Sequence, residues 1–203
     1  MHFDLPTLIK TFGYPLVWGI VFAESGLLVG FLLPGDSLLF VAGFLCSLPQ
    51  TGLDISVMAF GCFVFAVLGD SVGYYTGKRF GRKLFDKEDS KFFNKKHLIA
   101  AEDFFESQGK TALILARFMP FVRTFAPIVA GIAAMQYRTF MTYNVVGGFG
   151  WGIGLTVLGY FLGKIIPAEQ LDRYLIPIVL LVMFISLAPS VIHMLKARQR
   201  NKN

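Results

Sequence analysis

Four charged side chains interrupt two apolar segments of this chain, and each of these segments is broken by proline. A charged side chain at the centre of a bilayer costs roughly 2.5–3.5 kcal/mol on insertion scales, and more by other estimates. Their presence therefore predicts a membrane protein that acts on a charged substrate or a proton. The four residues are Glu24, Asp36, Arg117 and Arg123.

The remainder of the sequence supports a membrane location. Only 16% of the 203 residues are charged and the mean hydropathy is +0.61, whereas a soluble domain carries about 25% charged residues. Three apolar runs, at 56–76, 143–162 and 174–191, approach the ~20 residues that a helix needs to cross the hydrocarbon core. We therefore expect an all-α polytopic membrane protein that forms one membrane domain over residues 1–203.

The net charge of +6 is concentrated in two regions that flank the expected spans. One is the loop at 78–109, and the other is the C-terminal tail at 196–203, which contains no acid. A soluble nucleic-acid-binding protein can carry such clusters, but beside membrane spans they indicate cytoplasmic segments by the positive-inside rule. Residues 50–54 contain no Lys or Arg, which places them on the opposite side. We expect a cytoplasmic C-terminus and no nucleic-acid partner.

The sequence contains an internal repeat with an offset of 86 residues. Repeat 1 covers about 10–80 and repeat 2 about 97–165, and each is a broken apolar segment followed by a Gly-rich spanning helix. The matched positions are Pro34 with Pro120, Gly61 with Gly147, Gly73-Tyr74 with Gly159-Tyr160, and Gly77-Lys78 with Gly163-Lys164.

The repeat and the two basic regions together predict a topology. Both basic regions lie on one side, and two spans, at 141–163 and 174–195, already connect them. The segment 110–135 therefore does not cross the membrane and is predicted to be a re-entrant hairpin, because it is too short to cross twice. An amphipathic helix at 92–106 leads into it along the membrane surface.

The first broken segment becomes a second hairpin, which enters from the opposite side. Such inverted repeats are typical of secondary transporters, whose sites are built from broken helices. The predicted hairpin breaks are Pro34, Gly35, Pro120 and Pro127.

Glycines recur every four residues along the expected spans. This spacing places them on one helix face and allows a second helix to approach closely. The same faces could join two copies of the chain in a homo-oligomer. The glycines concerned are Gly69, Gly73, Gly77 and Gly81, with the pairs Gly150/Gly154 and Gly159/Gly163 in the second half.

Arg117 and Arg123 flank the break at Pro120. A broken helix exposes unpaired backbone N–H groups, and guanidinium groups suit bidentate binding of phosphate or carboxylate. We therefore expect an anion site there. The alternative is that both arginines only pair with Glu24 and Asp36, although apolar packing would hold the hairpins together at lower cost.

Glu24 and Asp36 are the candidates for proton coupling. Burial raises the pKa of a carboxylic acid, so that it can take up and release protons near neutral pH. Asp36 could also cap the helix that follows Pro34-Gly35. Asp70 and Thr124 are secondary candidates within the membrane.

Enzymatic chemistry is not expected. The three histidines, His2, His97 and His193, lie near termini or interfaces, which disfavours a lipid phosphatase with a His nucleophile. The sequence also lacks a Cys/His set with metal-ligand spacing, a phosphate-binding loop and a nucleophile elbow. We therefore predict no enzyme activity, no metal and no cofactor.

The motifs resemble those of the DedA family of bacterial inner-membrane proteins, over roughly residues 10–195. They are Glu24…Pro34-Gly35-Asp36, Gly69-Asp70-x-x-Gly73-Tyr74-x-x-Gly77 and Arg117-Phe-Met-Pro120-Phe-Val-Arg123-Thr124…Gly131. This family shares the VTT (SNARE-associated) domain with eukaryotic lipid scramblases. The resemblance implies a role in recycling undecaprenyl phosphate, in membrane homeostasis and in proton-dependent stress tolerance. It also implies that the essential acids are Glu24 and Asp36 and the essential arginines Arg117 and Arg123.

The function expected from the sequence is a proton-coupled flippase for a phosphate-bearing lipid in the bacterial cytoplasmic membrane. The arginines would bind the phosphate headgroup while the acids exchange protons. Two other functions stay open: an energy-independent phospholipid scramblase, and a proton-coupled carrier of small cations in which the arginines are structural. The expected partners are an anionic membrane lipid and protons.

Overall fold

The computed structural model describes residues 5–27, 35–85, 112–117 and 120–165. Every regular element in these residues is helical, which confirms the all-α class. The helices are α1 (Leu5–Gly26), α2 (Gly35–Cys46), the 3₁₀ turn η2 (Pro49–Thr51), α3 (Ile55–Phe85), α5 (Ala112–Arg117), α6 (Pro120–Ile132), α7 (Tyr137–Gly148), the π-helical segment η4 (Phe149–Ile153) and α8 (Gly154–Ile165).

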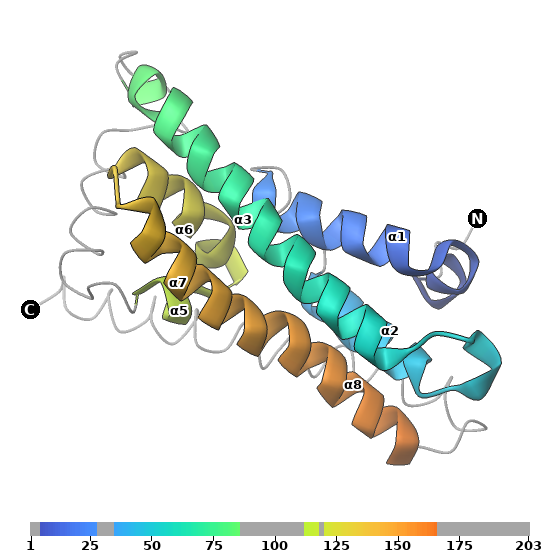
Figure 1. Cartoon of the computed structure of the whole chain (residues 1–203). Coiled ribbons are helices and arrows are strands. Elements are labelled where there is room, and N and C mark those ends of the chain that lie inside the picture. Colours follow the sequence, from blue (N-terminus) through green and yellow to red (C-terminus); the bar gives the residue numbers. More distant parts are fainter. Residues whose placement is uncertain (1–4, 28–34, 86–111, 118–119, 166–203) are drawn as a thin grey trace, which may run out of the picture.

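Two long apolar helices dominate the described part of the chain. One is Ile55–Gly81 within α3, and the other is Tyr137–Ile165, in which α7, η4 and α8 are continuous. Their mean hydropathies are 2.0 and 1.6, and both are long enough to cross a membrane. They run in opposite directions (Figure 1). The predicted third span at 174–195, the amphipathic helix at 92–106 and the basic tail lie outside the described residues.

α3 begins at a capped end and extends further than expected. The Asp54 carboxylate accepts hydrogen bonds from the backbone N–H groups of Ser56 (2.8 Å) and Val57 (3.0 Å), as an N-cap residue does. No proline interrupts the 31 residues that follow. The helix ends at Phe85, so it includes the first residues of the segment that was expected to be a loop from position 78.

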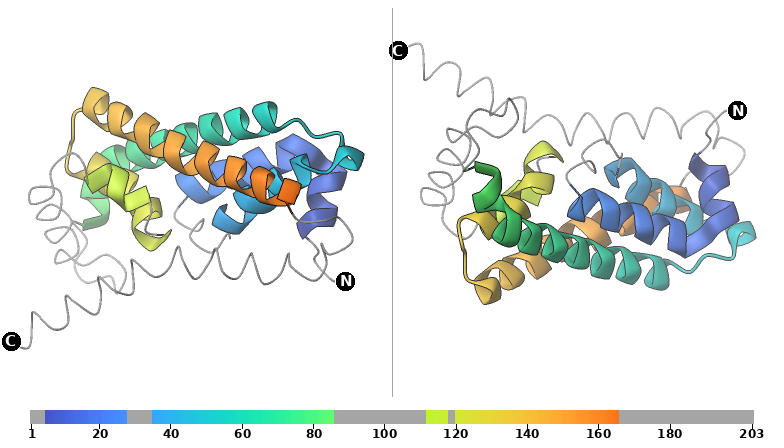
Figure 2. Two further views of the ribbon diagram at one scale, coloured as in Figure 1. Left: turned by 90° about the horizontal axis from the view of Figure 1, so that it is seen from below. Right: turned by 90° about the horizontal axis from the view of Figure 1, so that it is seen from above.

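The shorter helices divide between the two ends of the long pair. α1 and α2 lie beside the half of the pair near Ile55 and α8, whereas α5 and α6 lie beside the other half (Figures 1 and 2). Each half has its own apolar core, one around α1 and α2 and one around Tyr74 and Phe140. In α3, Ala66 belongs to the first core and Tyr74 to the second, so Asp70 lies where the two cores meet.

Glycines allow the backbones of neighbouring helices to touch, as the four-residue spacing predicted. A Cβ at Gly77 of α3 would overlap the backbone of Ile128 in α6, and one at Gly131 would overlap Tyr74 O. The α2–α8 contact is made in the same way, because a Cβ at Gly159 would overlap Phe40 O. Gly154, in contrast, faces open space. A homo-oligomer formed through the glycines stays a prediction.

The predicted hairpin breaks have different outcomes. Gly35 and Pro120 are the first residues of α2 and α6, and Pro34 lies outside the described residues. Pro127 was predicted to be a break, but α6 continues through it to Ile132. A proline inside a helix removes one backbone hydrogen bond without necessarily ending the helix. The re-entrant path of the two segments and their inverted relationship stay predictions of the sequence.

Candidate functional site

Arg123 connects two acids from the N-terminal half of the chain. Its Nη1 donates to Asp36 Oδ1 and its Nη2 donates to Glu24 Oε1. Arg123 lies in the first turns of α6, Asp36 in the first turn of α2 and Glu24 near the end of α1. All three side chains are buried. A single guanidinium therefore joins α6 to two consecutive helices of the N-terminal half of the chain.

Trp151 of the π-helical segment completes this cluster. Its indole Nε1 donates to Asp36 Oδ1 at 2.7 Å. The guanidinium carbon of Arg123 lies 4.3 Å from the centroid of its ring, within the range of a cation–π interaction. Trp151 thus contacts both the acid and the base of the same ion pair.

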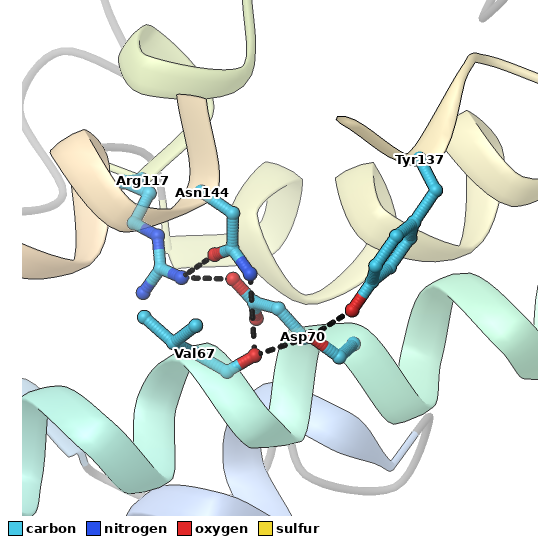
Figure 3. A network of polar contacts seen from close by, with 6 residues as sticks. Val67, Asp70, Arg117, Tyr137 and Asn144 are labelled. Atoms are coloured by element: carbon cyan, nitrogen blue, oxygen red, sulfur yellow. Dashed lines mark hydrogen bonds and ion pairs between the residues drawn. The ribbon is translucent and has the colours of Figure 1, made fainter. Parts of the chain in front are cut away.

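Arg117 belongs to a second cluster. Its Nη2 donates to both Asp70 Oδ2 and Asn144 Oδ1. The Asn144 amide in turn donates to the backbone carbonyl of Val67 at 3.2 Å (Figure 3). This contact joins α5, α3 and α7 in the middle of the molecule.

Polar contacts continue from this second cluster along α3. The Ser71 hydroxyl donates to Val67 O at 2.8 Å, and the Tyr137 hydroxyl lies 3.5 Å from Ser71 Oγ (Figure 3). Tyr137 is the first residue of α7 and is only partly buried. The contacts therefore lead from the buried Arg117 toward a less buried position at the beginning of α7.

The two clusters together carry an unbalanced charge. They contain the three acids Glu24, Asp36 and Asp70 and the two bases Arg117 and Arg123, so with every group ionised the net charge is −1. Removing one partner from a buried ion pair is strongly destabilising, whereas a proton bound by a carboxylate changes the balance without removing a side chain. Protonating one acid makes the site neutral, and protonating two makes it positive.

Both arginines line one small pocket. It opens among α3, α5, α6 and α7 and has room for about one water molecule in this conformation. A lipid headgroup therefore does not fit without a change of structure. The lining residues are Asp70, Leu113, Arg117, Arg123, Ala126, Pro127, Phe140 and Asn144.

Buried polar atoms of Arg123, of its sequence neighbour Thr124 and of its ion-pair partner Glu24 have no hydrogen-bond partner among the described residues. Arg123 Nε and the Thr124 hydroxyl are two of them, and Glu24 Oε2 is a third. Buried polar groups are nearly always paired, so unpaired ones require an explanation such as a missing water, ion or ligand. Arg123 Nε can only donate, which suits an anion, whereas Glu24 Oε2 suits a donor or a proton.

The described residues contain no cluster of three His, Cys, Asp or Glu side chains that could hold a metal. The acids that do come together, Glu24 and Asp36, are both engaged by Arg123. The candidate site is therefore one of ion pairs.

The ion pairs in the structure differ from the alternative considered in the sequence, in which both arginines pair with Glu24 and Asp36. Glu24 and Asp36 do lie against an arginine, but only against Arg123. Arg117 pairs instead with Asp70, which the sequence placed among the secondary candidates. Thr124, the other secondary candidate, is buried beside Arg123.

Two residues of the site were not found by sequence reasoning, Asn144 and Trp151. Asn144 is an amide inside an otherwise apolar span, which is a usable signal because a polar side chain at that depth needs a partner. Trp151 gives a weaker signal, since a tryptophan in an apolar segment is ordinarily a core residue. Its polar role depends on which groups the fold brings near it.

Comparisons with known proteins identify the relatives of this chain. The VTT domain matches residues 33–161. Protein DedA of Escherichia coli (strain K12) is 41% identical over 204 residues, which cover 98% of this chain and 92% of that protein. An uncharacterized membrane protein of Mycobacterium tuberculosis (strain ATCC 25618 / H37Rv) is 44% identical over 184 residues, or 91% of this chain and 79% of the relative. No solved structure matches the chain.

Proposed function

Since this chain belongs to the DedA family of VTT-domain membrane proteins, we propose that it carries a phosphate-bearing lipid across the bacterial cytoplasmic membrane together with protons. The proposed lipid is undecaprenyl phosphate. In this proposal Arg117 and Arg123 bind the phosphate, and Glu24 and Asp36 take up and release the protons. The C-terminal tail faces the cytoplasm.

The observation that carries the proposal is the pairing of Arg123 with two carboxylates at once. A carboxylate and a phosphate compete for the same guanidinium donors, and Arg is the side chain best suited to bind either in a bidentate manner. Phosphate can therefore replace the acids at Arg123 when their charge is removed. Protonation of the acids and binding of phosphate become one coupled event.

The charge count gives the direction of coupling. With all acids ionised the site carries −1 and repels an anionic headgroup, whereas protonation of Glu24 and Asp36 leaves +1, which attracts it. Protons bind preferentially on the more acidic side of the membrane, which in respiring bacteria is the outside. The phosphate is therefore picked up outside and released inside, where the acids lose their protons and reclaim Arg123.

The small pocket represents the closed form of the site in this scheme. It is lined by residues of α3, α5, α6 and α7. Admission of a headgroup requires these helices to move apart. The ion pairs that protonation of Glu24 and Asp36 weakens join α6 to α1 and α2, so their loss frees α6 to move at the pocket. The chemistry that creates the anion site is thus also the chemistry that allows it to open.

The experiment is a headgroup-accessibility assay in proteoliposomes that contain a polyprenyl phosphate, with and without a pH gradient. We expect net movement of the phosphate toward the alkaline side, and its loss in Arg123→Gln. Asp54→Asn, a change of an exposed acid that caps α3, is the matched control and should transport normally. Equal exchange without a gradient would support the scramblase instead. Proton flux that follows an added cation but no lipid would support the cation carrier.

A further inference from the structure

Trp151 lies where the two ion-pair clusters meet. Only 2% of its surface is exposed, and its ring lies against both arginines, with guanidinium carbons 4.3 Å (Arg123) and 6.0 Å (Arg117) from its centroid. Its indole N–H donates a hydrogen bond to Asp36 Oδ1 at 2.7 Å. One side chain therefore contacts members of both ion-pair clusters.

The two interactions of Trp151, its hydrogen bond to Asp36 and its ring contact with Arg123, respond differently to protonation of the acids. The hydrogen bond to Asp36 and the ion pairs of Arg123 depend on the charge of the acids. The attraction between the indole ring and a guanidinium does not, because neither group titrates near neutral pH. When the acids are protonated, Arg123 loses both of its ionic partners and keeps the ring.

The backbone at Trp151 is π-helical, which is rare in proteins. Trp151 is the central residue of the π-helical segment η4, between Gly150 and Gly152. Gly152 lies so close to α3 that a Cβ would be 3.1 Å from the Phe63 Cα. π turns within α-helices occur frequently at functional sites. The wide turn fits closely against α3 and holds Trp151 at the ion pairs.

We propose that Trp151 is a positioning residue, which keeps the Arg123 guanidinium in place while the acids around it are neutral. Without the ring, Arg123 would be free to leave the site when Glu24 and Asp36 bind protons, and a phosphate would find no ordered partner. The link to phosphate rests on the proposed function. The coupling between the indole and the acids does not, and it can be measured in the protein alone.

Fluorescence gives that measurement, because the chain has only two tryptophans. Trp18 stacks on Tyr14 and Phe65 in α1 and α3, away from the ion pairs, so Trp18→Phe leaves Trp151 as the single reporter. The charged groups that reach Trp151 are Asp36 and the two arginines directly. Glu24 and Asp70 reach it only through the arginines.

We expect the emission of the Trp18→Phe protein to change in a titration step as the pH is lowered. The step should disappear in Trp18→Phe/Asp36→Asn and persist in Trp18→Phe/Asp54→Asn, in which the acid lies outside the clusters. A step that is unchanged when Asp36 is replaced, or no step at all, overturns the inference.

Transport variants test the positioning role itself. Trp151→Leu removes the ring, and we expect the half-saturating lipid concentration at acidic pH to rise roughly tenfold, the size of a strong cation–π contact, with the maximal rate less affected. Trp151→Phe keeps a ring and should retain part of the affinity. Equal losses in the two variants, or a fall in maximal rate alone, would contradict positioning of Arg123.

The two proposals fail differently. A fluorescence step that depends on Asp36, in a protein that moves no phosphate lipid under any gradient, would leave the indole–acid coupling standing and overturn the lipid function. Lipid transport with a Trp151 emission that ignores Asp36 would do the reverse.

Discussion

Arg117 and Asp70 form a buried ion pair across 47 positions of sequence, with the base at the end of α5 and the acid near the middle of α3. The pair differs from the Arg123 cluster in one respect. Arg117 uses a single nitrogen, Nη2, for both Asp70 and Asn144, whereas Arg123 uses two nitrogens for two acids. We therefore expect the same substitution to have different effects on transport at the two arginines.

Lysine should replace Arg117 better than Arg123. An ammonium group has three donors on one nitrogen, so Lys at 117 can serve both Asp70 and Asn144, but Lys at 123 cannot span Glu24 and Asp36 with a planar fork. We expect Arg123→Lys to lose roughly tenfold or more in transport, the equivalent of one charged hydrogen bond. The measurement is lipid transport normalised to inserted protein. Equal loss in both variants would show that the fork is needed at both positions.

Removing the charge of Asp70 should destabilise the protein. Asp70→Asn leaves the buried Arg117 without its counter-charge, which costs about 3–5 kcal/mol in comparable cases. Adding Arg117→Gln should restore part of the loss, because the second change removes the unpaired charge. Thermal unfolding in detergent, with Asp54→Asn as the control, would test this. Additive losses in the double variant would contradict the pairing.

Transport should depend on external pH through Glu24 and Asp36. In the wild type, raising the external pH leaves fewer carboxylates protonated, so the site is more often negative and transport of an anion falls. Glu24→Gln and Asp36→Asn fix a neutral side chain and should flatten this dependence while exchange down a lipid gradient continues. The measurement is initial transport rate across a range of external pH. Parallel profiles in all three proteins would mean that other groups couple the protons.

Added methyl groups should distinguish glycines in contact from those that are free. Gly77→Ala and Gly131→Ala place a Cβ against the backbone of α6 and α3, and overpacking of this kind costs typically about 1–3 kcal/mol. Gly154→Ala is the matched control, since no atom lies within 4 Å of its Cβ. Melting temperatures in detergent would decide. A loss at Gly154 equal to that at Gly77 would contradict the tight α3–α6 contact.

Cysteine labelling tests the side of the membrane on which each segment lies. Both native cysteines are buried, so added ones can be read individually. A membrane-impermeant reagent applied to intact cells should label a cysteine at Gln50 and should not label one at Lys91 or Arg200. External labelling at Lys91 would overturn the predicted cytoplasmic location of the 78–109 segment and the re-entrant assignment that follows from it.

The sequence predicted the helical class and the charged residues because both depend on local composition. Charges in apolar segments are costly wherever the chain places them, so Glu24, Asp36, Arg117 and Arg123 could be selected without a structure. Their partners could not. The Arg117–Asp70 pair depends on α5 packing against the middle of α3, which no local pattern specifies.

Tertiary packing also explains why two further residues, Pro127 and Trp151, differ from what the sequence predicted. A proline such as Pro127 is typical of a helix break, but α6 packs against α3 there and stays helical. The Cβ of Pro127 lies 3.4 Å from where a Cβ of Gly73 would lie. Trp151 has the composition of a core residue and becomes polar in role only because α2 and α6 bring Asp36 and Arg123 to it. Tertiary contacts decide both cases.

The π-helical segment η4 differs in its winding from the stretch of α3 that corresponds to it in the sequence repeat. The 86-residue offset relates Gly61 to Gly147 before the segment and Gly73 to Gly159 after it, so no residue has been inserted. Residues 63–67 of α3 form an ordinary α-helix, and their counterpart η4 is wound more loosely with the same number of residues. Phe63 and Phe149, at equivalent positions, face each other with ring centroids 6.2 Å apart. Two stretches of equal length therefore touch at matching residues and are wound differently, so the likeness between the halves of the sequence does not extend to the backbone beside the ion pairs.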